Sequence, residues 1–373
     1  MRSTRTRLGV SLATATVVAA AAVLAIPVFA ETTRTLRIEY APSGPFAVEN
    51  LAGAMRVTAG TTDKVVVVAT VHAEDDATAG LMKLEQVAGE KSIPTLRMIY
   101  PTDTYTTFRY PADAQEDLNW LERLFGYDNS STTKYAGRRV TVRSGGGVLL
   151  YADVRIELPR RAVEGTFRNL VGPMDGSGVE GKLLFDGSSS DMTLANLKGE
   201  ITADTGSGDV KADTLSGTYT CDTGSGNCIL KGFTGDKVVC NVGSGDIQIH
   251  SGSARVMEMN TGSGDVEVTD FDVEDFKADT GSGDVLVAVS GDRMASFKAD
   301  TGSGDVTLRM DADATFEAHC DLSSGDAVSH YRDAEPIMKD KEIVGFRRGS
   351  GRTRITVGTG SGDFTLEPGT PGT

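Results

Sequence analysis

Apolar and polar residues alternate with a period of two through most of the C-terminal half of the chain, in short segments on both sides of a recurring Gly-rich turn. Such alternation is typical of β-strands that bury one face. The apolar position nearest to the turn on its N-terminal side holds Ala203, Cys221, Cys240, Met259, Ala278, Ala299 and Cys320 in successive copies. The nearest position on the C-terminal side holds Val210, Cys228, Ile247, Val266, Val285 and Val306. The pattern predicts pairs of strands whose apolar columns face a shared interior.

The turn between these strands reads Thr-Gly-Ser-Gly-Asp in most copies. Its acid is Asp209, Asp246, Asp265, Asp284, Asp305 and Asp363, with Asn227 in one copy and weaker copies that end at Asp191 and Asp326. Successive copies from Asp191 to Asp326 are 18 to 21 residues apart. At such a period each repeat is one unit of a stacked array. We therefore expect an all-β fold, a right-handed single-stranded parallel β-helix (β-solenoid) with repeats of about 19 residues.

The segments outside the regular repeats define the remaining parts of the chain. Residues 31–73 alternate like early strands of the same domain, and 138–330 hold the solenoid with its Gly-Ser-Gly-Asp turns. Between them, residues 74–137 form a polar insert, and the amphipathic stretch at 117–125 predicts a short helix there. Residues 331–350 are charged and contain Pro336, which predicts a loop insert, and 351–373 are expected to close the stack and end in a short tail.

The N-terminal residues predict export. Arg2, Arg5 and Arg7 precede an uncharged apolar run up to Val28, and Ala30 ends a small-x-small cleavage pattern. Residues 1–30 are therefore expected to be a signal peptide that is cleaved, which would place the protein in the periplasm, at the cell surface or outside the cell. The alternative is an uncut membrane anchor, because the run is about 20 residues long. After cleavage no stable membrane insertion is expected.

Composition and charge narrow the class of protein. The chain has 44 glycines, one tryptophan and 6% aromatic residues, which favours a thin, turn-rich repeat architecture. Its formal net charge is −15, and loss of the three N-terminal arginines would make it −18. A surface of that charge repels phosphates, so no nucleic-acid partner is expected.

Three features together resemble a known family. They are the opening Val-Glu-Asn-Leu-Ala-Gly-Ala-Met-Arg-Val segment at 48–57, the Tyr-Ala-Asp-Val-Arg-Ile-Glu-Leu-Pro strand at 151–159, and the train of Thr-Gly-Ser-Gly-Asp-Val turns. With the signal peptide, they resemble the putative-adhesin family of exported bacterial proteins over most of residues 46–367. The resemblance implies a right-handed β-helix and an adhesin-like role. The helical insert departs from the family pattern.

The repeated acids are the first candidates for a site. Stacked turns would align them in one file, and Ca²⁺ prefers carboxylate and carbonyl oxygens. The calcium candidates are Asp209, Asp246, Asp265, Asp284 and Asp305. A second file of Asp279, Asp300 and Asp321 is expected beside the first. Alternatively, hydrogen bonds from turn amides, or the neighbouring Lys277 and Lys298, stabilise these negative charges without calcium. No other cofactor is expected.

Cysteines and histidines supply the remaining candidates. Cys221 and Cys240 occupy the same column in adjacent repeats, so they are a candidate disulfide in an oxidising compartment. The alternative is that all four cysteines, Cys228 and Cys320 included, are small buried hydrophobic residues. The histidines at positions 72, 250, 319 and 330 lack the spacing of a zinc site.

No nucleophile, phosphate-loop or metalloprotease motif accompanies the repeats. The sequence therefore favours a non-enzymatic, adhesin-like solenoid of the cell envelope or the secreted fraction, with an unknown protein or a cell-surface carbohydrate as its partner. A periplasmic structural or signalling accessory module is one alternative. A polysaccharide-active enzyme with its site in the insert at 74–137 is the other.

Overall fold

The computed structural model describes residues 31–111, 130–289 and 293–369. The predicted signal peptide at 1–30 and the predicted helix at 117–125 lie outside the described residues.

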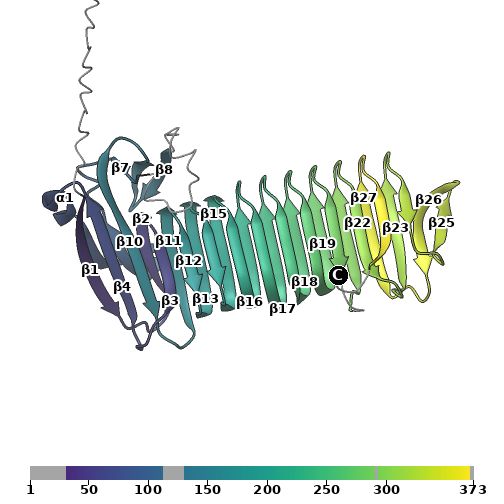
Figure 1. Cartoon of the computed structure of the whole chain (residues 1–373), viewed down its shortest axis with the longest axis horizontal. Coiled ribbons are helices and arrows are strands. Elements are labelled where there is room, and N and C mark those ends of the chain that lie inside the picture. Colours follow the sequence, from purple (N-terminus) through teal and green to yellow (C-terminus); the bar gives the residue numbers. More distant parts are fainter. Residues whose placement is uncertain (1–30, 112–129, 290–292, 370–373) are drawn as a thin grey trace, which may run out of the picture. The chain divides into compact units, whose positions relative to one another are not determined.

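Parallel strand pairing between successive repeats dominates the fold (Figure 1). Each repeat forms one coil, which consists of a strand before the Gly-rich turn and a strand after it. Four long strands join the second arm of one coil to the first arm of the next. They are β16 (Val210–Thr223), β17 (Cys228–Val242), β18 (Ile247–Thr261) and β19 (Val266–Thr280). The predicted all-β, β-solenoid fold is confirmed.

Shorter strands continue the stack on both sides of these four. Before them lie β11 (Val163–Val171), β12 (Met174–Ser177), β13 (Glu180–Ser189), β14 (Met192–Ala195) and β15 (Lys198–Ser207). After them lie β20 (Val285–Val289), β21 (Ser296–Thr301) and β22 (Val306–Asp311). All of these pair in parallel with their counterparts one repeat away.

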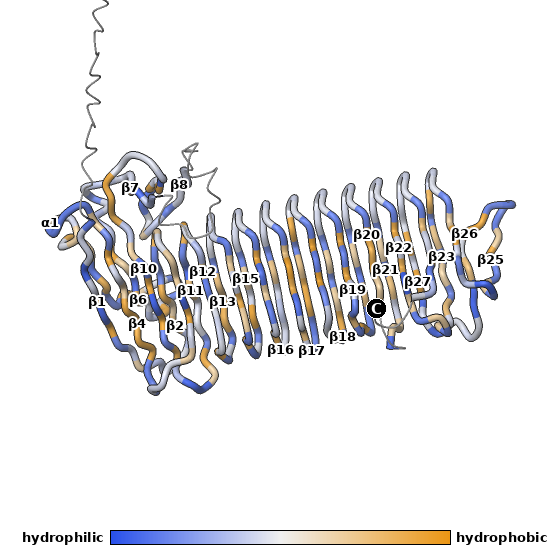
Figure 2. The backbone as a smooth tube through the Cα atoms, viewed as in Figure 1, coloured by the Kyte–Doolittle hydropathy of each residue, from blue (hydrophilic) through white to orange (hydrophobic). Residues whose placement is uncertain are grey.

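The interior consists of the predicted apolar columns. Hydrophobic and hydrophilic residues alternate along the strands of the stack (Figure 2). Val210, Cys228 and Ile247, from one predicted column, are fully buried, as is Ala203 from the other. Aromatic side chains stack between coils in the same way, and the rings of Phe276 and Phe297 lie 5.2 Å apart. At about 25 cal/mol per Å² of buried apolar surface, these columns are the main stabilising contribution.

The threonine of each turn is buried and satisfies backbone groups. The Thr261 hydroxyl donates to the carbonyl oxygen of Gly245 on the preceding coil, at 2.9 Å, and accepts from the Gly264 amide at 3.2 Å. Thr280 and Thr301 repeat this pair of contacts in the next coils. A buried hydroxyl without such partners would destabilise the fold. The turn threonine is therefore part of the architecture.

The two turn glycines allow the coils to approach each other closely. A Cβ atom at Gly262 would lie 2.3 Å from the carbonyl oxygen of Gly243, and one at Gly264 would lie 2.0 Å from that of Gly245. Both distances are far below van der Waals contact, so any side chain here would push neighbouring coils apart.

The N-terminal end of the domain is partly antiparallel. There β4 pairs antiparallel with both β1 and β10, while β2 and β3 lead into the parallel stack through β11 and β12. The bounds are β1 (Thr32–Tyr40), β2 (Phe46–Ala52), β3 (Met55–Ala59), β4 (Val65–Ala73) and β10 (Val148–Leu158).

The segment expected to be a polar insert is mainly strand where it is described. Its elements are α1 (Asp76–Gly80), β5 (Lys83–Ala88), the 3-10 turn η1 (Glu90–Ser92), β6 (Pro94–Ile99), β7 (Thr107–Arg109) and β8 (Ser130–Tyr135), followed by β9 (Arg138–Arg143). Parallel pairing joins β6 to β2 and β7 to β10. The segment thus extends the sheet, and Leu96 and Met98 are buried on either side of Arg97.

The last strands do not close the stack as expected. Strands β27 (Thr353–Thr359) and β28 (Phe364–Gly369) lie between the β21–β22 coil and the coil formed by β23 (Phe316–Leu322) and β24 (Ala327–Ser329). Figure 1 shows β27 between β22 and β23. The end of the chain therefore inserts between two coils that precede it in sequence.

The turns of these two coils differ in sequence. A coil inside the stack must fit a neighbour on both sides, and the turn at 359–363 carries the complete Thr-Gly-Ser-Gly-Asp motif. The turn of the β23–β24 coil has Leu322 and Ser323 in place of the threonine and first glycine. A Cβ atom at that glycine position points toward the preceding coil of the stack, so Ser323 faces the β27–β28 coil, and Ser188 occupies the same position inside the stack.

The segment expected to be a loop at 331–350 is a β-hairpin instead. Strands β25 (Glu335–Lys339) and β26 (Glu342–Arg348) pair antiparallel with each other, and β26 pairs antiparallel with β23. Buried Phe346 packs into the core, and Tyr331 stacks edge-on against Phe316 at 5.2 Å. The charged sequence concealed the hairpin because most of its other side chains face solvent.

Candidate binding surface

The turn acids form a continuous hydrogen-bonded file, here called the turn ladder. The Asp265 amide donates to Asp246 Oδ1 at 3.0 Å, and the Asp284 amide donates to Asp265 Oδ1 at 2.8 Å. The same contact links every member in stack order. The members are Asp191, Asp209, Asn227, Asp246, Asp265, Asp284, Asp305, Asp363 and Asp326. Asn227 fits because its amide oxygen accepts the same bond.

The ladder contains all five calcium candidates, Asp209, Asp246, Asp265, Asp284 and Asp305. Each of them uses one carboxylate oxygen to accept an amide hydrogen bond from the next coil. Within residues 31–111, 130–289 and 293–369, no three His, Cys, Asp or Glu side chains form a group that could hold a metal ion. Calcium binding at the ladder stays a prediction.

A second file of acids runs along the outward face of the strands that precede the turns, and we call it the outward file. Strand register places its members opposite one another in adjacent coils. They are Asp186, Asp204, Asp222, Asn241, Asn260, Asp279, Asp300, Gly358 and Asp321. Of the predicted second file, Asp279 and Asp300 are neighbours, whereas Gly358 separates Asp300 from Asp321.

Like charges in the outward file face each other without amide donors of the kind that support the turn ladder. Although the Asp204 residue is exposed overall, partial desolvation of its carboxyl group, and then the charges of Asp186 and Asp222, raise the pKa of Asp204. Asp204, Asp222 and Asp279 are all exposed. The middle of the file is neutral, because Asn260 Nδ2 donates to Asn241 Oδ1 at 2.9 Å. The file therefore presents two acidic stretches separated by an amide pair.

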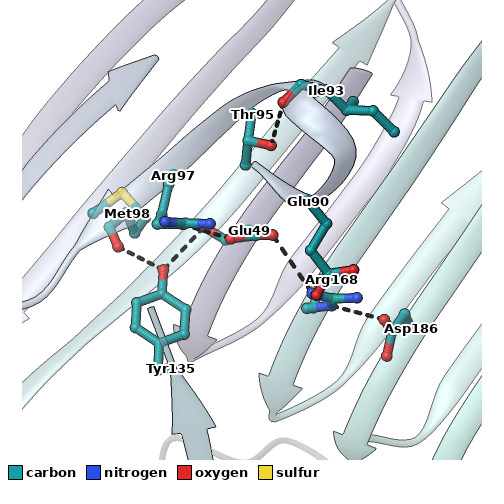
Figure 3. Close-up of polar contacts among 9 residues, drawn as sticks. All are labelled: Glu49, Glu90, Ile93, Thr95, Arg97, Met98, Tyr135, Arg168 and Asp186. Carbon is teal, nitrogen blue, oxygen red and sulfur yellow. Dashed lines mark hydrogen bonds and ion pairs between the residues drawn. The ribbon is translucent and has the colours of Figure 1, made fainter. Parts of the chain in front are cut away.

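The N-terminal end of the outward file is a network of buried ion pairs (Figure 3). Glu49, 9% exposed, contacts Arg97 Nε at 2.5 Å through Oε2 and Arg168 Nη1 at 3.6 Å through Oε1. Arg168 Nε lies 2.7 Å from Asp186 Oδ2. The Tyr135 hydroxyl covers this network and donates to the carbonyl oxygen of Met98 at 2.5 Å. Arg168 thereby pairs with the first acid of the file and offsets only part of the raised pKa of Asp204.

The four histidines lie apart, and His72 has the most structured surroundings. Its Nδ1 is 2.5 Å from Glu31 Oε1, its Nε2 is 3.1 Å from Asp153 Oδ2, and its ring stacks on Tyr151 at 4.5 Å. Burial opposes protonation, but Asp153 and Glu31 outweigh it and raise the pKa of His72. This group ties β1, β4 and β10 together.

The family follows from the repeats that build both files. Residues 153–367 match the pattern of the Toastrack DUF4097 family. The chain belongs to that family. The match covers the Toastrack coils from the end of β10 to the intercalated β27–β28 coil, and it therefore includes the whole turn ladder. No curated protein matches the sequence.

Several solved structures are similar to this Toastrack protein. A "putative lipid binding protein" from Parabacteroides distasonis shares 12% identity with a TM-score of 0.41, covering 90% of this chain and 96% of that one. A "putative adhesin" from the same organism shares 13% identity, with a TM-score of 0.39 and coverage of 89% and 97%. A "putative adhesin" from Bacteroides fragilis shares 11%, with a TM-score of 0.33 and coverage of 89% and 97%.

Three of the four cysteines meet in the Toastrack core. Cys221, Cys228 and Cys240 are fully buried free thiols, and the sulfur atoms of Cys228 and Cys240 lie 3.3 Å apart. Cys221 and Cys240 are register partners, as the sequence predicted, and the Cys221 thiol also contacts those of Cys228 and Cys240, so the three thiols form one cluster. Burial raises the pKa of the Cys228 thiol. Cys320 lies half-buried near the end of the stack.

The C-terminal end of the Toastrack stack carries a groove of about 530 Å³ between the last coil and the hairpin loop. Asp321 and Asp326 line it on the coil side, and Asp340 and Glu342 on the hairpin side. Both acid files thus continue into the groove. In the part of the chain that the structure describes, no helix is long and apolar enough to cross a membrane.

Proposed function

We propose that this Toastrack protein is an exported, non-enzymatic protein of the cell envelope or cell surface that binds a positively charged partner protein through the outward file. The observation that carries the proposal is the row of exposed carboxylates at one-coil spacing, with Asp204 held between two other acids. A repetitive array of negative charges suits an extended partner better than a small molecule.

Electrostatics give the reason for placing the partner at the outward file. Adjacent coils are about 4.8 Å apart, and like charges at that distance repel by roughly 1 kcal/mol even in water. In the turn ladder each carboxylate receives an amide hydrogen bond, whereas Asp204 has acids on both sides. A cationic segment lying along the file would relieve this repulsion, so binding and charge neutralisation are coupled.

Export is supported by the sequence. The Arg-rich start, the apolar run and Ala30 have the pattern of a cleavable signal peptide. The absence of a catalytic motif and the use of the repeat's threonine, glycines and acid in coil stacking support a binding role. Fractionation of the producing cells, with the N-terminus of the isolated protein sequenced, tests the location separately from binding.

The binding test compares variants of purified residues 31–373 on intact cells of the producing organism and on poly-lysine. The triple variant Asp204→Asn, Asp222→Asn, Asp279→Asn removes three charges from the outward file. We expect binding about tenfold weaker, from roughly 0.5 kcal/mol for each lost charge pair. Binding should also weaken as salt rises, because exposed charges are screened beyond about 8 Å at physiological ionic strength.

A matched control keeps the outward file and removes the same charge from the strands that follow the turns. It is Asp213→Asn, Glu267→Gln, Asp270→Asn, all exposed positions. The proposal requires this control to bind like the parent protein. If both variants lost binding equally, binding would depend on net charge alone and not on the outward file. The protein-partner proposal would be overturned if the parent protein did not bind cells, or if it bound only to a carbohydrate array.

A further inference from the structure

The three buried cysteines occupy one layer of the Toastrack interior and come from both sides of a coil. Cys221 lies on the arm of β16 that leads into a turn, and Cys228 follows that turn. Cys240 lies on the part of β17 beyond the corner at Gly232, whose φ is +66°, and therefore on the first arm of the next coil. Cys228 and Cys240 therefore face each other across the interior, from the second arm of one coil and the first arm of the next. Their sulfur atoms are 3.3 Å apart.

Stacked cysteines are less suited to a disulfide than facing ones. Cys221 and Cys240 are in-register neighbours in parallel strands, so their Cα and Cβ atoms keep the strand spacing of about 4.8 Å. Disulfides need Cβ atoms about 3.5 to 4.5 Å apart. Facing side chains can close the gap between sulfur atoms by rotating about χ1, without moving the backbone of two hydrogen-bonded coils.

We infer that Cys228 and Cys240 form a disulfide across the core between the two ends of β17 when the protein folds in an oxidising compartment. The location rests on the proposed export; the pairing rests on the geometry alone. The oxidant is a disulfide-bearing oxidoreductase, or oxidised glutathione in vitro. One cysteine thiolate attacks a sulfur of the oxidant's disulfide, which breaks that S–S bond and forms a mixed disulfide. The second cysteine thiolate then attacks the first cysteine's sulfur, so the protein S–S bond forms and the oxidant leaves as two thiol groups that carry both electrons.

The bridge has a defined structural consequence. It closes a short loop from 228 to 240 and ties the two arms of β17 together where the coil is most regular. Cys221 stays a buried thiol beside it, and Cys320 stays a thiol near the end of the stack. Because the fully buried thiols are sealed from solvent, the bridge must form before the coil closes.

The experiment maps the cysteines of the protein in two samples. In the first, the full chain is expressed with its leader, and denatured material is alkylated and digested without reductant. In the second, reduced residues 31–373 are refolded with a mixture of reduced and oxidised glutathione. Both should give one peptide pair joined through Cys228 and Cys240, with Cys221 and Cys320 alkylated. Oxidation should raise the Tm by about 4 °C, from the closed-loop entropy spread over a chain of this size.

Two variants separate the pairing from general effects on the core. Cys228→Val places the residue found at 210, 266 and 285 in the same column, and it should abolish the Tm increase on oxidation. Cys221→Ala copies Ala203 in its own column and should keep the increase. A Cys221–Cys240 linkage, or four alkylated thiols in the refolded sample, would overturn the inference. A bridge in the refolded sample but four thiols in the cellular one would instead count against export.

Discussion

The turn ladder gives the sharpest energetic prediction. Replacing Asp246, Asp265 and Asp284 by alanine removes three acceptors, and each leaves one backbone amide of the next coil without its partner. A net hydrogen bond of this kind is worth about 1 kcal/mol at an exposed site. Replacement by asparagine keeps the acceptor, as natural Asn227 does, and also removes like charges. The account therefore predicts opposite outcomes for two triple variants that lose the same charge.

The assay is a thermal melt of purified residues 31–373 followed by circular dichroism. A loss of about 3 kcal/mol in the alanine variant should lower the Tm by roughly 4 °C, given an unfolding entropy near 2.1 cal/mol/K per residue. The asparagine variant should melt at or slightly above the parent Tm. Equal destabilisation of the two variants would refute the ladder as a hydrogen-bonded structure and would point to a need for the charges themselves.

The remaining predictions concern cations, the intercalated coil and His72. The parent Tm should change by less than about 1 °C between calcium and chelator, because ladder amides already hold the carboxylates; a shift of several degrees would establish cation sites. Removal of residues 351–373 should expose the amides of 316–348 to hydrogen exchange, because the β23–β24 coil loses its parallel partner; unchanged protection would contradict the observed stacking order. The raised pKa of His72 stabilises the fold below its unfolded value of 6.5, and this contribution is lost as pH rises past the raised pKa. His72→Gln should therefore flatten the change in Tm between pH 5.5 and 8.5, and an unaltered pH profile would exclude that role.

Much of the fold could be predicted because each coil repeats the same local chemistry. The period and the inward columns identify the strands, and the turn acids must align once the coils stack. Three of the six acids in the outward file, Asp279, Asp300 and Asp321, are identified by the sequence. Asp186, Asp204 and Asp222 stand at the same distance before their turns, so the signal for them was present in the spacing.

The order of the last coils could not be predicted in the same way. Any coil with a Thr-Gly-Ser-Gly-Asp turn presents the same edges, so local sequence permits several stacking orders. Leu322 and Ser323 distinguish their turn, but a side chain at the first glycine position also occurs inside the stack, at Ser188. The ion-pair network at Glu49 and Arg168 was also hidden, because these residues are far apart in sequence and only the register of β2 on β11 brings them together.

The most direct test of the proposed binding surface is the titration of the Asp204 carboxyl group by carbon NMR, with and without poly-lysine. The account predicts a pKa above the ordinary value of 3.8 in the free protein, because of burial and of Asp186 and Asp222. It predicts a fall in that pKa when the polycation binds, since a positive neighbour favours the charged form. A free-protein pKa at or below 3.8, or one that poly-lysine leaves unchanged, would contradict the outward file as the binding surface.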